Sequence, residues 1–153
     1  MRFLLILLAL LLPASAMAQN QVALTSEVLV ERTTTDANGA ARTSLEPPGV
    51  VTPGDRLVFV LSYHNNAAAP ATDFVVTNPI PDSVSFTGAE SAGSVLSVDG
   101  GQTWGALAAL TVRNADGSSR PAAPGDVTHI RWRIAQPIPA GGGGELRFRG
   151  VVK

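Results

Sequence analysis

The stretch from Thr52 to Pro81 constrains the fold of this chain most strongly, because it holds a long alternating segment between turn residues. Thr52-Pro53-Gly54-Asp55 predicts a tight turn, since proline fixes φ and glycine supplies a positive φ. Residues 56–65 then alternate with a period of two, which is typical of a strand that packs one face on a core. The inward face is expected to hold Leu57, Phe59, Leu61 and Tyr63, and the other face Val58, Val60, Ser62 and His64.

Other short segments have the same character, with β-branched and aromatic residues between clusters of glycine, proline, asparagine and aspartate. Strands are predicted at residues 22–32, 41–45, 73–77, 83–87, 94–98, 129–134 and 145–152. A helix is the competing interpretation for residues 22–32. Residues 107–113 could form a strand, although residues 106–110 would also suit one helical turn. Asp36-Ala37-Asn38-Gly39 predicts a hairpin turn. Val50-Val51 is expected to form a short edge segment, and residues 114–125 an exposed irregular loop.

These segments carry polar outer faces and are not separated by crossover helices, which favours an antiparallel sandwich of two sheets over a parallel sheet. The last two strands alternate most clearly. They place Ile130, Trp132 and Ile134, and likewise Leu146, Phe148 and Val152, toward the core. We expect an all-β fold of about seven to nine strands, with an extra N-terminal hairpin.

The first eighteen residues read as a secretory leader: a basic start at Arg2, an apolar run from Phe3 to Leu12, and a small-x-small ending at Ala18. The apolar run is too short to span a membrane. We therefore expect cleavage after Ala18, a strand and hairpin over residues 19–48, and a sandwich over residues 49–153. The expected location is the periplasm or the cell exterior, where the lack of cysteine leaves stability to the core alone.

Charge gives little reason to expect a nucleic-acid partner. The chain has 11 basic and 12 acidic residues, and removal of the leader takes away only Arg2 from this balance. A nearly neutral domain has a weak long-range field, so the composition does not favour nucleic acid as a partner.

The order of several motifs resembles a known family. The motifs are Pro53-Gly54-Asp55, the strand to Tyr63, Asn65, Asn78-Pro79-Ile80-Pro81, Asp99-Gly100-Gly101-Gln102-Thr103-Trp104, and Ile138-Pro139-Ala140-Gly141. Over about Val50 to Val152, the chain resembles the bacterial conserved-repeat domain of unknown function number eleven. The resemblance implies an immunoglobulin-like sandwich of a cell-envelope or surface protein with no assigned catalytic residues. That family usually occurs in tandem arrays, whereas this chain carries a single copy.

Residues suited to catalysis or metal binding are scattered. His64 and His129 are the only histidines, and no second ligand stands at a zinc-binding spacing from either. Serines lack the sequence context of a nucleophile, and thiol chemistry is unavailable. Asp82, Asp99 and Asp116 could hold calcium if they converged, but Asp-Gly pairs are first of all turn formers. No enzyme activity, cofactor or metal is therefore expected.

The arginines near the C-terminus are the strongest candidates for binding. Arg131, Arg133, Arg147 and Arg149 would share one outer face if the last two strands formed a hairpin. Such a face either deters edge aggregation or docks carboxylates or phosphates of an envelope polymer or acidic partner, which arginine binds in bidentate fashion. Trp104 follows a turn and is a further candidate contact residue, whereas Trp132 is expected in the core. Lys153 is terminal and a poor candidate for an internal isopeptide bond.

The sequence thus predicts a non-enzymatic exported module that binds an envelope protein or an anionic polymer. An alternative is a self-assembling filament or surface-layer subunit whose strand Val22 to Glu31 completes a neighbouring copy, so homo-oligomerisation stays open. A lesser alternative is a hydrolase that uses His64 or His129. Neither a nucleic acid nor a membrane span is expected.

Overall fold

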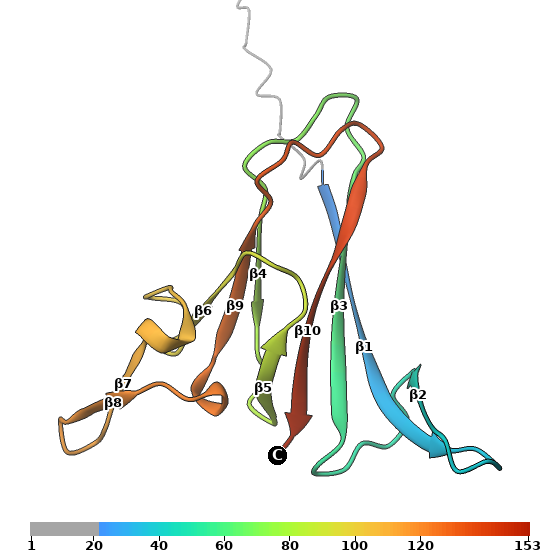
Figure 1. Cartoon of the computed structure of the whole chain (residues 1–153). Helices are drawn as coiled ribbons and strands as arrows, with labels where there is room; N and C mark the ends of the chain where they lie inside the picture. Colours follow the sequence, from blue (N-terminus) through green and yellow to red (C-terminus); the bar gives the residue numbers. More distant parts are fainter. Residues whose placement is uncertain (1–21) are drawn as a thin grey trace, which may run out of the picture.

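The computed structural model describes residues 22–153. The predicted leader and its cleavage site therefore lie outside the described residues. Within them the chain is all-β, and its elements are shown in Figure 1. They are β1 (Val22–Thr35), β2 (Ala41–Glu46), β3 (Arg56–Asn65), β4 (Val75–Pro79), β5 (Val84–Ala89), β6 (Ser94–Ser97), the 3-10 helix η1 (Leu107–Ala109), β7 (Thr111–Arg113), β8 (Ser119–Pro121), the 3-10 helix η2 (Pro124–Asp126), β9 (His129–Arg133) and β10 (Gly143–Val152).

The strands form two antiparallel sheets and one separate hairpin. The larger sheet has the order β2-β1-β3-β10-β5, and the smaller sheet has the order β4-β9-β6. Figure 1 shows the two sheets beside each other, with the β1–β2 hairpin at one lower corner and the β7–β8 hairpin at the other. Neither of the short helices among residues 22–153 is long and apolar enough to cross a membrane.

The N-terminal segment is a strand, as predicted, and the helical alternative is wrong. Residues 22–31 of β1 pair with β3, and residues 30–35 pair with β2. The turn from Asp36 closes this hairpin, with Gly39 at a φ of 80° donating to the Asp36 carbonyl. β1 is therefore an integral strand of the larger sheet.

One apolar core lies between the two sheets. The Phe59 and Phe148 rings of the larger sheet stack at 4.4 Å, and the indole ring of Trp132 from the smaller sheet lies 6.2 Å from Phe148. Trp132 is 1% exposed and Phe148 is completely buried. Aromatic rings contribute large buried areas, so this group holds the two sheets together.

The bounds of β3 agree with the prediction, but residues 57–61 are buried on both faces. Val58 and Val60 point away from the shared core, yet they are 1% and 5% exposed. Their cross-strand neighbours in β10 are Arg149 and Arg147. Long arginine side chains can shield apolar neighbours with their methylene stems while the charged ends stay in water.

Gly150 stands at the inward-facing position of β10 between Phe148 and Val152, where the alternating pattern has no apolar side chain. A Cβ at this position would lie 2.4 Å from Cγ1 of Val84 and 3.1 Å from the Ser85 carbonyl oxygen. The pairing of β10 with β5 also shifts register between Arg149 and Gly150. Glycine is thus required here because β5 approaches the backbone too closely for any side chain.

Two expected strand positions are wrong. Val50-Val51 forms no strand, and Val50 is 88% exposed, because prolines at 47 and 48 precede it and cannot donate ladder hydrogen bonds. The strand expected at residues 73–77 begins instead at Val75 and continues to Pro79. Asp73 has a φ of 54°, a left-handed conformation that interrupts the extended backbone.

The segment from 107 to 125 is more ordered than predicted. Its first part contains the helical turn η1 and then β7, so each of the two interpretations holds for part of it. The expected loop contains β8, which pairs with β7 around a turn at Asn114–Ser118, and then η2. β8, with three residues, is too short for an alternating pattern to identify it.

Asn65, the last residue of β3, joins two loops. Its side-chain amide donates to the carbonyls of Ala69 (2.9 Å), Ile138 (2.9 Å) and Pro139 (3.2 Å), and its Oδ1 accepts from the Ala67 backbone N–H. Asn65 is completely buried. A single side chain therefore satisfies backbone groups of both loops.

Candidate binding surface

The two strands that carry the four candidate arginines lie in different sheets. β9 pairs with β4 and β6, whereas β10 pairs with β3 and β5. The hairpin that would have gathered Arg131, Arg133, Arg147 and Arg149 on one face is therefore absent. The loop between β9 and β10 crosses from one sheet to the other, so the arginines divide into two pairs on separate outer faces.

The pair on β10 is already engaged by carboxylates. Arg147 Nη2 lies 2.9 Å from Glu145 Oε2, and the Arg149 guanidinium donates to both Glu31 and Glu90. The hydrogen bond to Glu90, followed by that to Glu31, raises the pKa of Arg149 above its usual value. Charges paired in this way offer little net field to an anionic ligand.

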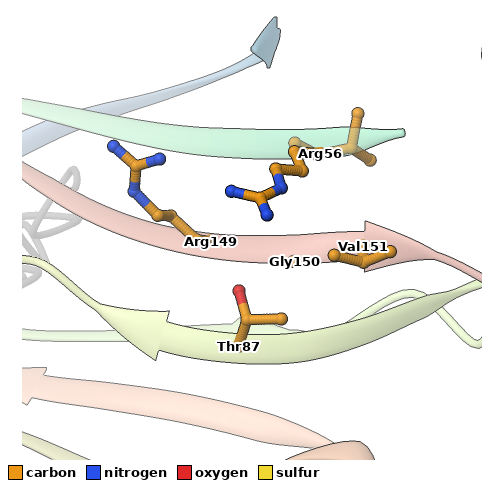
Figure 2. Close-up of a pocket in the computed structure, with 6 residues that line it drawn as sticks. Arg56, Thr87, Arg149, Gly150 and Val151 are labelled. Atoms are coloured by element: carbon orange, nitrogen blue, oxygen red, sulfur yellow. The ribbon is translucent and has the colours of Figure 1, made fainter. Parts of the chain in front are cut away.

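A shallow cavity of about 230 Å³ on the larger sheet is lined by Arg149 together with Arg56 and Thr87. Figure 2 shows the guanidinium groups of Arg56 and Arg149 on the same side of the sheet, with the Thr87 hydroxyl directed toward the space between them. Glu31 contacts both arginines, at 3.7 Å from Arg56 Nη1. The two arginines are balanced by the carboxylates of Glu31 and Glu90, so the cavity offers no excess positive charge to an anionic ligand.

The pair on β9 has a different environment. The Arg131 guanidinium carbon lies 3.7 Å from the centroid of the Trp104 ring, which is cation–π geometry. Arg131 Nε also donates to the Thr77 hydroxyl at 3.0 Å. Among residues 22–153, Arg131 forms no ion pair with a carboxylate. The structure thus brings together two of the predicted contact residues, Trp104 and Arg131, from distant parts of the chain.

Neighbouring side chains extend this surface. His129 contacts the Trp104 ring edge-on, with ring centroids 6.3 Å apart. Arg133 is exposed and lies 3.7 Å from the exposed carboxylate of Asp73, while Val75 is directly opposite Arg133 on β4. We call this outer face of the smaller sheet the Trp104 face. It comprises Val75, Thr77, Trp104, His129, Arg131 and Arg133.

The loop after β6 holds Trp104 in place through a dense set of hydrogen bonds. Asp99 Oδ1 accepts from the hydroxyl of Ser97 (2.7 Å) and from the backbone N–H groups of Gln102 (3.0 Å) and Thr103 (2.9 Å). The Thr103 hydroxyl donates to Asp99 Oδ2 at 2.6 Å. Trp104 Nε1 then donates to the Gly101 carbonyl at 2.8 Å, which fixes the orientation of the indole ring.

Asp99 is the centre of this loop, although the sequence had suggested only a turn or a calcium ligand there. Hydrogen bonds from the Thr103 hydroxyl, the Thr103 backbone and the Ser97 hydroxyl hold the pKa of Asp99 well below its ordinary value. The sequence pattern that could have predicted this loop is the placement of Ser97, Asp99, Gly101 and Thr103 at every second position before a tryptophan. Small polar side chains at these positions can close the loop on itself.

The other candidate residues remain apart. His64 is exposed on β3 of the larger sheet, whereas His129 lies on the smaller sheet. No group of three or more residues of the metal-binding types converges within residues 22–153. Asp116 accepts from the Ser118 hydroxyl and N–H in its own turn, and Lys153 donates to the Asp82 carbonyl.

No model of a known protein family, no curated protein and no solved structure matches this chain. The argument for function therefore depends on the geometry of the Trp104 face and on the chemistry of its residues.

Proposed function

We propose that this chain is a non-enzymatic, exported interaction module of the cell envelope that binds an anionic polymer or an envelope protein through the Trp104 face. The observation that carries the proposal is the stack of Arg131 on Trp104 at 3.7 Å. Within the described chain this arginine has no carboxylate partner, unlike Arg147 and Arg149. Its positive charge is thus free for a ligand.

The chemistry of the face fits a carboxylated or phosphorylated polysaccharide best. Arginine offers a planar set of donors that matches carboxylate and phosphate oxygens. The indole ring of Trp104, held at a fixed orientation, stacks on the Arg131 guanidinium and positions it for such a ligand. The Asp99-centred loop fixes Trp104 in advance, so binding costs little conformational entropy.

An immunoglobulin-like fold is part of the proposal, as the resemblance to the conserved-repeat domain implies. Two antiparallel sheets that enclose one core support it. The motifs that carry the resemblance also have structural tasks: Asp55 accepts from the Thr52 N–H in the first turn, Asn65 joins two loops, and Asp99 closes the loop to Trp104. Proteins that share a fold are expected to share residues that form such structural hydrogen bonds.

Export rests on the leader-like residues 1–18. N-terminal sequencing of the protein recovered from the culture medium and from the periplasm tests it. We expect Gln19 as the first residue in one of these fractions. A full-length N-terminus confined to the cytoplasm would contradict export.

Charge reversal tests the binding face. We expect Arg131→Glu with Arg133→Glu to abolish binding to polygalacturonate and to isolated envelope polysaccharide in a sedimentation assay. The matched control is Arg42→Glu with Arg113→Glu, which makes the same change of charge at exposed positions away from the face. Binding should weaken as ionic strength rises. Equal binding by the two double variants would refute the assignment of the face.

The two alternatives have less support. A strand that completes a neighbour should fill the neighbour's core, yet Val30 is the only fully buried residue of β1. A hydrolase would need a base beside a nucleophile or metal, and His64 and His129 stand on different sheets. Retention of any purified activity in the double His→Ala variant would exclude these histidines.

A further inference from the structure

The N-terminal half of β1 is an open edge of the larger sheet. β2 covers β1 only from Val30 onward, and no described strand pairs with Val22–Leu29 on the side away from β3. Along this stretch Glu27 is the only charged residue, and proline is absent. Its free N–H and C=O groups can therefore accept another strand.

The other edges of the two sheets are protected. η2 packs against the edge strand β5, and β6 is short and bridged by Gly105. β4 ends in proline, and β2 carries Arg42 and Glu46. Proteins usually protect sheet edges by such means, so an unprotected stretch of β1 calls for an explanation.

We infer that this edge pairs with the same edge of a second copy to form a two-fold symmetric dimer, a role separate from the Trp104 face. Antiparallel pairing about a two-fold axis perpendicular to the sheet joins the two larger sheets into one continuous sheet. Side chains on the inward face of one copy then lie beside side chains on the inward face of the other. This pairing requires one residue of β1 to lie directly opposite the same residue of the second copy, with the axis midway between them. Because both copies use the same edge, the interface is isologous, so two copies complete the pairing and no third copy can be added to it.

The sequence selects Ser26 as the residue on the axis. Leu24 then faces Val28 of the other copy on the inward side, and Ala23 faces Leu29 on the outward side. Thr25 faces Glu27, so polar residues also meet polar residues. The pairing covers residues 23–29, which ends just before Val30, where β2 occupies the same side.

Neighbouring registers are less favourable. An axis at Thr25 would place Leu24 opposite Ser26 and Ala23 opposite Glu27, so apolar side chains would face polar ones. An axis at Glu27 would bring two carboxylates together and would run the partner strand into β2. Pairing about Ser26 also covers Leu24, which is 45% exposed and is one of the large apolar side chains left uncovered.

Analytical ultracentrifugation of the purified protein at rising concentration tests the dimer. We expect the mass to double at submillimolar concentration, because a single strand pair buries less area than a standard interface. Ser26→Lys places two positive charges on the axis and should keep the protein monomeric. Thr25→Lys, the matched control, faces Glu27 and should leave the dimer intact or strengthen it.

A cysteine cross-link tests the register without relying on charge. The chain has no cysteine, so Ser26→Cys introduces a single thiol opposite its copy. Directly opposed Cα atoms of an antiparallel pair are about 4.5–5.5 Å apart, within the range for a disulfide. Mild oxidation should cross-link this variant, whereas Thr43→Cys on β2 should stay monomeric.

Circular dichroism of each variant confirms that the fold is kept. The inference is overturned if the protein stays monomeric at every concentration, or if Ser26→Lys dimerises as well as the unmodified protein. It is also overturned if Thr25→Lys abolishes the dimer while Ser26→Lys does not, since that result moves the axis to Thr25.

Discussion

Replacement of Asn65 by alanine should destabilise the protein by about 3 kcal/mol, at roughly 1 kcal/mol for each hydrogen bond. The side chain contacts three carbonyls and one N–H, but its two amide hydrogens are shared among the carbonyls, which leaves about three independent bonds. Ile138 and Pro139 each keep a backbone donor after the change, from Ala71 and Gly142. Their desolvation therefore adds little to this loss.

Urea unfolding and thermal melts give the measurement. A loss of about 3 kcal/mol lowers the melting temperature of a domain of this size by roughly 10 °C. Asn66→Ala is the control, because Asn66 is the exposed neighbour. A change below about 0.5 kcal/mol for Asn65→Ala would refute the view that this amide joins the two loops.

The variant Asn65→Asp adds a pH signature. The new carboxyl group cannot donate when ionised and faces carbonyl oxygens in a buried site, so its pKa should be raised in the folded state. Its stability deficit relative to the unmodified protein should then be smallest below about pH 4 and should grow as the pH rises. A deficit that does not vary with pH would contradict this placement.

Two further stability predictions follow from the packing and the charges. Gly150→Ala should cost about 1–3 kcal/mol in urea unfolding because its Cβ would overlap Val84, whereas Gly88→Ala has open space and serves as the control. Acid should destabilise the fold, because the pKa of Asp126 is lowered to about 2 and that of Asp99 is also lowered. The stability from these carboxylates is complete above the unfolded pKa near 3.8 and is lost as the pH falls toward about 2. Melting temperatures measured between pH 7 and pH 2.5 test the predicted acid destabilisation. Asp99→Asn should make the melting temperature fall less steeply with acid. A melting temperature that stays constant or rises as the pH falls would contradict the prediction.

Local patterns of the sequence predicted most of the elements. Pro53-Gly54 and the alternation that follows identified β3 with its observed bounds, and Asp36–Gly39 identified the turn between β1 and β2. These signals depend on backbone preferences of adjacent residues. β8 was missed because a three-residue strand holds no periodicity, and β7 was predicted only as one of two interpretations of residues 107–113.

The sheet to which each strand belongs was not readable from such patterns. β9 and β10 alternate equally well, but alternation says only which side chains share a face. Their separation into two sheets depends on pairing with β4 and β3, which are far away in sequence. The one-face arrangement of the four arginines failed for this reason, while Trp104 and Arg131 met through a contact that no local pattern encodes.

Tryptophan fluorescence during titration with polygalacturonate tests the central claim most directly. The chain has two tryptophans, and Trp132 is 1% exposed, so a ligand-dependent change reports on Trp104. We predict a saturable change that is lost in Trp104→Phe and in Arg131→Glu with Arg133→Glu, and that neutral dextran does not produce. Binding that leaves the Trp104 signal unchanged, or that persists in the arginine double variant, would contradict the account.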